Sequence, residues 1–179
     1  MECEDPVAFR QREQWQWTNC ANGPRTSNDT ALQRQPPVNT SSDMLALTDL
    51  VAAFRDCTLP KQEWTHLAHL RVGAWHVHHF GGPAALAMLR AGIRRLNDSH
   101  GTPNSSDSGY HETITVAYVR LIEEFLAGVE DGLPLERRVE LLTESPLADR
   151  PVLFRFWSRD LLLSARARAE WVPPDLAPL

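Results

Sequence analysis

Two stretches of the chain place histidines at spacings that suit metal binding. Residues 64–71 read WTHLAHLR and residues 109–115 read GYHETIT. Two imidazoles three positions apart on a helix can face one metal ion, and an imidazole from a second helix, with or without a carboxylate, completes a site that keeps an open position. We therefore predict a mononuclear metal site with His66, His69 and His111 as ligands. Glu112 is predicted as a fourth ligand or a general base, and Tyr110 as a catalytic neighbour that orients an imidazole or a bound water.

The helical phase of each histidine separates buried positions from exposed ones. At about 100° per residue, His66 lies in the middle of the apolar stripe of its helix, with His69 and His76 on one flank. His111 is also central to an apolar stripe, together with Tyr118. Two further histidines of the same predicted helix fall outside the stripe and are predicted to lie on the surface: His78 and His79.

The donor types leave the metal and the reaction open. Imidazole-rich sites suit iron, copper and zinc. We favour one divalent transition metal, iron or copper before zinc, in an oxidoreductase or oxygenase that acts on a small organic molecule. A zinc-type lyase or hydrolase is one alternative, and a non-catalytic metal sensor or small-molecule binding protein is another. A structural polar cluster or a metal-free acid/base pair fits the same residues, and Glu112 can simply be a favourable acidic residue in a first helical turn.

Four residues are suited to holding a substrate. Arg159 and Arg166 can each form a bidentate pair with a substrate carboxylate, although solvent exposure also explains them. Trp157 in the same C-terminal segment and Trp64 beside the first histidine motif offer aromatic surface. We predict these four as substrate-binding residues.

The elements that must position these residues are helices. Apolar residues recur at helical spacing from residue 43 onwards, and no stretch alternates as a β-strand does. The fold class is therefore predicted as an all-α, single-domain bundle of five or six helices over residues 43–179, the helical metal-binding domain. The polar stretch 97–109 is predicted as a lid or a surface connector. The predicted helices cover residues 43–59, 61–80, 83–96, 110–127, 134–146 and 164–171.

Residues 1–42 are predicted to form a poorly ordered N-terminal extension. They are rich in asparagine, serine and proline and poor in aliphatic residues, so they bury too little apolar surface to offset the entropy of ordering. Phe9, Trp15 and Trp17 are the exception, because they can dock on the domain as a short helix or arm.

Charge and composition argue against two classes of partner. A net charge of -5 gives the chain no general attraction to nucleic acid or to an anionic membrane. No apolar run approaches the roughly 20 residues that span a bilayer, and the first residues are acidic, so we expect a cytoplasmic location. The 3 cysteines are too widely spaced for a disulfide framework or a paired zinc motif. The expected partner is a small-molecule substrate, and the sequence carries no signal for the oligomeric state.

Several strings of the sequence together resemble a family of small bacterial proteins of unassigned function. They are Thr58-Leu59-Pro60, the WTHxxHLR and YHETIT motifs, and a closing Ala167-Arg168-x-x-Trp171-Val-x-Pro-Asp175. The resemblance covers residues 45–179 and implies an all-helical single domain whose paired motifs form the functional centre. One departure is the stretch 156–159, FWSR, which stands where similar proteins show a Tyr-Ser element.

Overall fold

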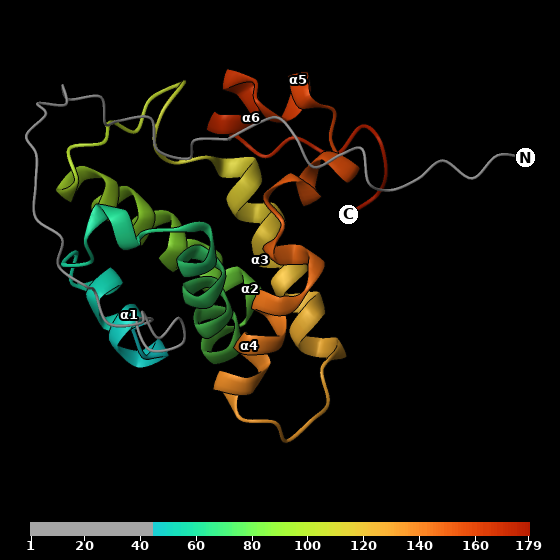
Figure 1. Cartoon of the computed structure of the whole chain (residues 1–179). Coiled ribbons are helices and arrows are strands. Elements are labelled where there is room, and N and C mark those ends of the chain that lie inside the picture. The colour runs from blue at the N-terminus through green and yellow to red at the C-terminus, as the bar shows by residue number, and fades with distance from the viewer. Residues whose placement is uncertain (1–44) are drawn as a thin grey trace, which may run out of the picture.

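The computed structural model describes residues 45–179, and regular structure in this range is entirely helical (Figure 1). This confirms the predicted all-α bundle. The predicted extension at 1–42, with Phe9, Trp15 and Trp17, lies outside the described residues. The α-helices are α1 (Leu47–Arg55), α2 (His66–Ser99), α3 (Glu112–Gly128), α4 (Leu135–Glu144), α5 (Arg159–Leu162) and α6 (Ala165–Ala169). Short 3₁₀ turns cover Lys61–Glu63, Pro146–Ala148 and Arg150–Arg155.

Helix α2 begins at the first histidine motif. The Thr65 hydroxyl accepts a hydrogen bond from the backbone N–H of Ala68 at 3.3 Å, which makes Thr65 the N-cap and His66 the first helical residue. The sequence predicted this helix from residue 61, but the backbone of Trp64 is not helical, so residues 61–63 form a separate turn. His66 therefore lies at a helix start, and helical side chains tilt toward the N-terminal end of their helix.

Helix α2 consists of two segments that meet at a kink. Gly81 has φ 71° and ψ 161°, a conformation that interrupts a helix and that glycine adopts at little cost. Pro83 follows in the first turn of the second segment, where its missing N–H loses no bond. At the kink, the backbone N–H of Gly82 donates a hydrogen bond of 2.8 Å to the Glu123 carboxylate of α3. The predicted boundary between the helices at 61–80 and 83–96 is thus present as a kink.

Two groups of buried side chains hold the fold together. The main core lies between α1, α2, α3 and α4. The C-terminal core lies between the first half of α3 and the segment from Val152 to Val172. Figure 1 shows α5 and α6 beside the start of α3. Helix α3 therefore belongs to both cores, one along each part of its length.

No helix of the described part of the chain combines the length and the apolar character needed to cross a membrane.

Candidate functional site

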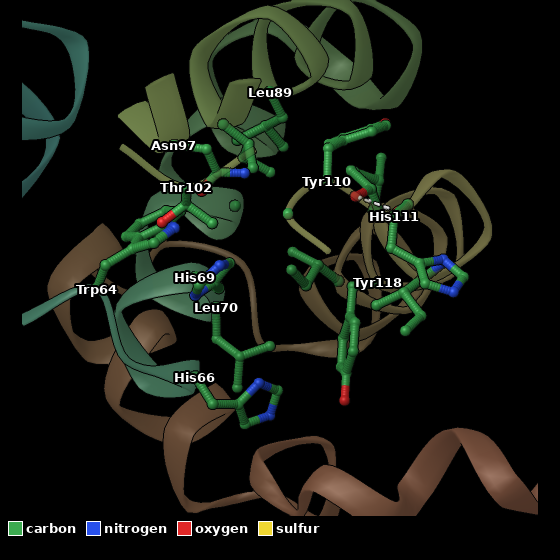
Figure 2. Close-up of a pocket in the computed structure, with 17 residues that line it drawn as sticks. Trp64, His66, His69, Leu70, Leu89, Asn97, Thr102, Tyr110, His111 and Tyr118 are labelled. Carbon is green, nitrogen blue, oxygen red and sulfur yellow. Dashed lines mark hydrogen bonds between the residues drawn. The ribbon is translucent and has the colours of Figure 1, made fainter. Parts of the chain in front are cut away.

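A cavity of about 90 Å³ lies between α2 and α3, next to the predicted histidine motifs (Figure 2). One water molecule needs about 15 Å³ measured in this way, so the cavity holds several waters or a small organic molecule. Three of the predicted residues, His66, His69 and Trp64, line it from the α2 side, and Tyr110 and His111 line it from the α3 side. The two motifs that are 45 residues apart in sequence thus meet at one place.

His66 lines this cavity and has one ring nitrogen without a partner. Its Nε2 atom is buried and has no hydrogen-bond partner within the described chain. The ring packs edge-on against Tyr118, with 5.3 Å between the centroids. Burial lowers the pKa of His66, opposed by the nearby backbone of Leu147. At neutral pH the imidazole is therefore uncharged.

His69 is oriented by the backbone of its own helix. Its Nδ1 lies 2.6 Å from the Thr65 carbonyl oxygen, to which it donates a hydrogen bond. This bond places the proton on Nδ1 and the lone pair on Nε2. The ring lies against Trp64 with 3.7 Å between the centroids. Burial lowers the pKa of His69 to about 4, so this imidazole is also neutral at pH 7.

His111 lines the cavity, but both of its nitrogens are used elsewhere. It is the N-cap of α3, where Nδ1 accepts a long hydrogen bond of 3.4 Å from the backbone N–H of Ile114. Its Nε2 donates to the carbonyl of Leu162 at 3.0 Å. Burial, followed by the charge of Arg168, lowers its pKa to about 4. Figure 2 shows the ring turned away from His66 and His69.

Glu112 forms a partly buried ion pair beside the cavity. Arg90 donates from Nε to the carboxylate at 3.0 Å and also from Nη2, and the Tyr110 hydroxyl donates at 2.8 Å. Burial disfavours the ionised carboxylate, but these bonds outweigh it and lower the pKa of Glu112. Burial and the same carboxylate raise the pKa of Tyr110 to about 12. The carboxylate is thus neutralised by Arg90, and it is not among the groups that line the cavity.

The predicted metal set is only partly assembled. Within residues 45–179, no three side chains of histidine, cysteine, aspartate or glutamate are grouped in a way that could hold a metal ion. His66 and His69 lie together, whereas His111 and Glu112 are engaged in the bonds described above. A metal role for these four residues stays a prediction.

The predicted substrate residues of the C-terminal segment lie away from the cavity. Trp157 is fully buried in the C-terminal core and donates from Nε1 to the Val172 carbonyl at 3.1 Å. Arg166 forms an exposed ion pair with Glu170, and the guanidinium of Arg159 lies 5.8 Å from the Phe154 ring. Of the four predicted substrate-binding residues, Trp64 lines the cavity.

Tyr118 is the site residue that the sequence interpretation undervalued. Its hydroxyl is buried, and within the described chain it has no hydrogen-bond partner. Burial raises the pKa of Tyr118, so the phenol stays protonated. Its position seven residues after His111 suggested only a core role, because helical spacing does not distinguish a packed ring from a ring with an unsatisfied hydroxyl.

Comparison with known proteins finds no matching protein-family model, no similar curated protein and no similar solved structure.

Proposed function

We propose that this protein binds a small organic molecule in the cavity between α2 and α3. The observation that carries the proposal is that two residues lining one cavity, His66 and Tyr118, each have a buried polar atom, Nε2 and the hydroxyl, without a hydrogen-bond partner in the described chain. A buried polar group without a hydrogen bond costs about 1–3 kcal/mol. A ligand oxygen placed between the two groups recovers that free energy. Such a pocket, largely apolar with a few converging polar groups, is typical of small-molecule sites.

The same pair can also act on the ligand. The neutral imidazole of His66 accepts or donates a proton according to its tautomer, and the Tyr118 hydroxyl donates a hydrogen bond to a ligand oxygen. A metal-free acid/base enzyme and a non-catalytic binding protein therefore share this binding step.

Calorimetric titration of the full chain with a library of small molecules tests the proposal. We expect ligands whose affinity falls at least tenfold in His66→Gln, because the polar partner is displaced. His78→Ala is the matched control, since His78 lies on the same helix but is exposed. Equal affinities in wild type and His66→Gln for every ligand would contradict the proposal.

A metal-dependent enzyme is the second candidate function, and the orientation of His69 favours it. A metal-binding histidine characteristically donates its other N–H to a backbone carbonyl or a carboxylate, as Nδ1 of His69 does to Thr65. Nε2 of His69 and Nε2 of His66 then supply two ligands to iron, copper or zinc. The ion would bind and polarise a small substrate, in an oxidoreductase or in a zinc-type lyase or hydrolase.

Metal content separates the two candidates. Protein purified without an affinity tag is loaded with iron, copper and zinc in turn and analysed for bound metal. If the second candidate holds, wild type retains stoichiometric metal that His66→Ala and His69→Ala lose, while His78→Ala and His79→Ala keep it. Wild type that retains none of the three metals contradicts the second candidate and leaves the binding proposal intact.

A further inference from the structure

The chemistry of the cavity wall limits what the ligand can be, on the premise that the proposed binding function holds. Among the described residues, none that lines the cavity carries a carboxylate, an ammonium or a guanidinium group. Glu112, beside the cavity, is already paired with Arg90, and the charges of Asp149 and Arg150 act on His66 and Tyr118 from outside the lining residues. Arg159 and Arg166, predicted to hold a substrate carboxylate, do not line the cavity. A charged ligand group therefore meets no counter-charge in this wall.

The titratable groups of the wall are neutral as well. The pKa values of His66, His69 and His111 are all lowered, with burial as the largest cause. The pKa values of Tyr110 and Tyr118 are raised, again chiefly by burial. At pH 7 the wall thus has no formal charge to offer an ion.

The rest of the wall is mostly hydrocarbon, with the uncharged side chains of Asn97, Thr102 and Thr115 as its other polar members. Transfer of an unpaired ion into such surroundings costs several kcal/mol, whereas transfer of an apolar ring or chain is favourable. The apolar side chains of the wall come from both α2 and α3: Leu70, Leu89, Ile93, Ile114, Val119 and Ile122.

We infer that the ligand is an uncharged molecule with a hydrocarbon body and a carbonyl or hydroxyl oxygen that lies between His66 and Tyr118. The cavity of about 90 Å³ limits its size to about six to ten non-hydrogen atoms without rearrangement of the wall. The Tyr118 hydroxyl donates to the ligand oxygen, and the hydrocarbon body packs along the wall toward Gly73 and Ile122.

Four probes of similar size test this inference on the full chain at pH 7.5: toluene, benzyl alcohol, benzylammonium and benzoate. Binding is followed by backbone amide shifts in two-dimensional NMR, with Gly73 and Ile122 reporting on the cavity. We expect benzyl alcohol to bind at least tenfold more tightly than benzylammonium or benzoate, and at least threefold more tightly than toluene.

Variants identify the oxygen site. In Tyr118→Phe, and independently in His66→Gln, the preference for benzyl alcohol over toluene should disappear while toluene still binds; the second variant serves if the first does not fold. A charged probe that binds in the cavity as tightly as benzyl alcohol overturns this inference but leaves the proposed function standing. Equal affinity for toluene and benzyl alcohol in wild type also overturns it. If no probe shifts the cavity amides, the proposed function fails together with the inference.

Discussion

Backbone carbonyls one turn earlier fix the tautomer of two histidines of α2, His69 and His76. His69 donates to the carbonyl of Thr65 and His76 donates to that of Val72, both four residues before them. The carbonyl four residues earlier points toward the side chain only where the preceding turn is helical or caps the helix. His66 is the first helical residue, so it has no such partner within its helix. The tautomer of His66 is therefore not fixed by its own helix, and its buried Nε2 has no partner within the described chain.

Replacement of Tyr118 by phenylalanine should separate stability from ligand binding. The change removes a buried hydroxyl that has no partner within the described chain, so the ligand-free variant should be as stable as wild type or more stable by up to about 1 kcal/mol. Urea unfolding measures the free energy. Tyr110→Phe is the control, because it removes the bond to Glu112 and should destabilise the protein by about 1 kcal/mol. A marked loss of stability in Tyr118→Phe would show that its hydroxyl has a partner in the folded protein.

His111 should make the protein acid-sensitive. Its pKa is about 4 in the folded protein and about 6.5 in an unfolded chain. As the pH falls below 6.5 the unfolded state binds a proton that the folded state does not, so the free energy of unfolding decreases between pH 6.5 and pH 4, by up to about 3 kcal/mol. His111→Asn retains an N-cap side chain that does not titrate. Its pH dependence, measured by urea unfolding, should be shallower over this window; an unchanged slope would assign the acid sensitivity to other groups.

Much of the candidate site could be predicted from the sequence, but the hydrogen bonds and ion pairs that its side chains form could not. Helical periodicity identified His66, His69 and His111, and the structure places all three around one cavity. The bond from His111 to Leu162 joins residues 51 positions apart, and local spacing carries no information about it. The same limit applies to the ion pair between Arg90 and Glu112, which joins residues 22 positions apart on two different helices.

At the scale of helices, close packing of α1 on α2 depends on a missing side chain. A Cβ atom at Gly92 would lie 2.5 Å from Cζ of Phe54, a ring that is almost fully buried. Gly92→Ala should therefore destabilise the fold by about 1–3 kcal/mol, because the ring has to shift within a packed core. Thermal and urea unfolding measure the loss.

Gly128→Ala is the matched control for this substitution. Gly128 ends α3 and has no neighbouring atom within 4 Å of the position of a Cβ, so alanine should be neutral or stabilising by up to about 1 kcal/mol. Equal stabilities of the two variants would contradict the proposed role of Gly92.

Long amphipathic helices were the predictable elements of this fold. The predicted ranges 83–96 and 110–127 lie within two or three residues of the second segment of α2 and of α3. The helix ends were less predictable, because His111 looks like a residue of a buried helical face but adopts the extended backbone of an N-cap. The 3₁₀ turn at Arg150–Arg155 has no sequence period of its own, since the contacts of Val152 and Leu153 with the C-terminal core stabilise it.

At the scale of the whole molecule, the C-terminal segment from Val152 to Val172 packs against α3, the helix that forms one wall of the cavity. Three bonds connect the start of α3 to this segment over more than fifty residues of sequence: His111 to Leu162, Thr113 to Glu170 and Arg168 to Gly109. Trp157, predicted to bind substrate, is a fully buried residue of the core between this segment and α3. The segment thus influences the site through the position of α3.

Thr113 is the residue whose replacement best tests this packing of the C-terminal segment against α3. Its hydroxyl donates to the Glu170 carbonyl at 2.8 Å and accepts from the backbone N–H of Val172 at 3.0 Å. Thr113→Val keeps the shape of the side chain but leaves both backbone groups unpaired, so the free energy of unfolding should fall by about 1–3 kcal/mol. Amide hydrogen exchange should show the loss of protection first in residues 156–172, because they depend on this connection. Thr143→Val, at a partly exposed threonine whose hydroxyl donates to Glu140 within α4, should change neither quantity. Uniform loss of protection across α1 to α4 would instead mean that the two cores unfold as one unit.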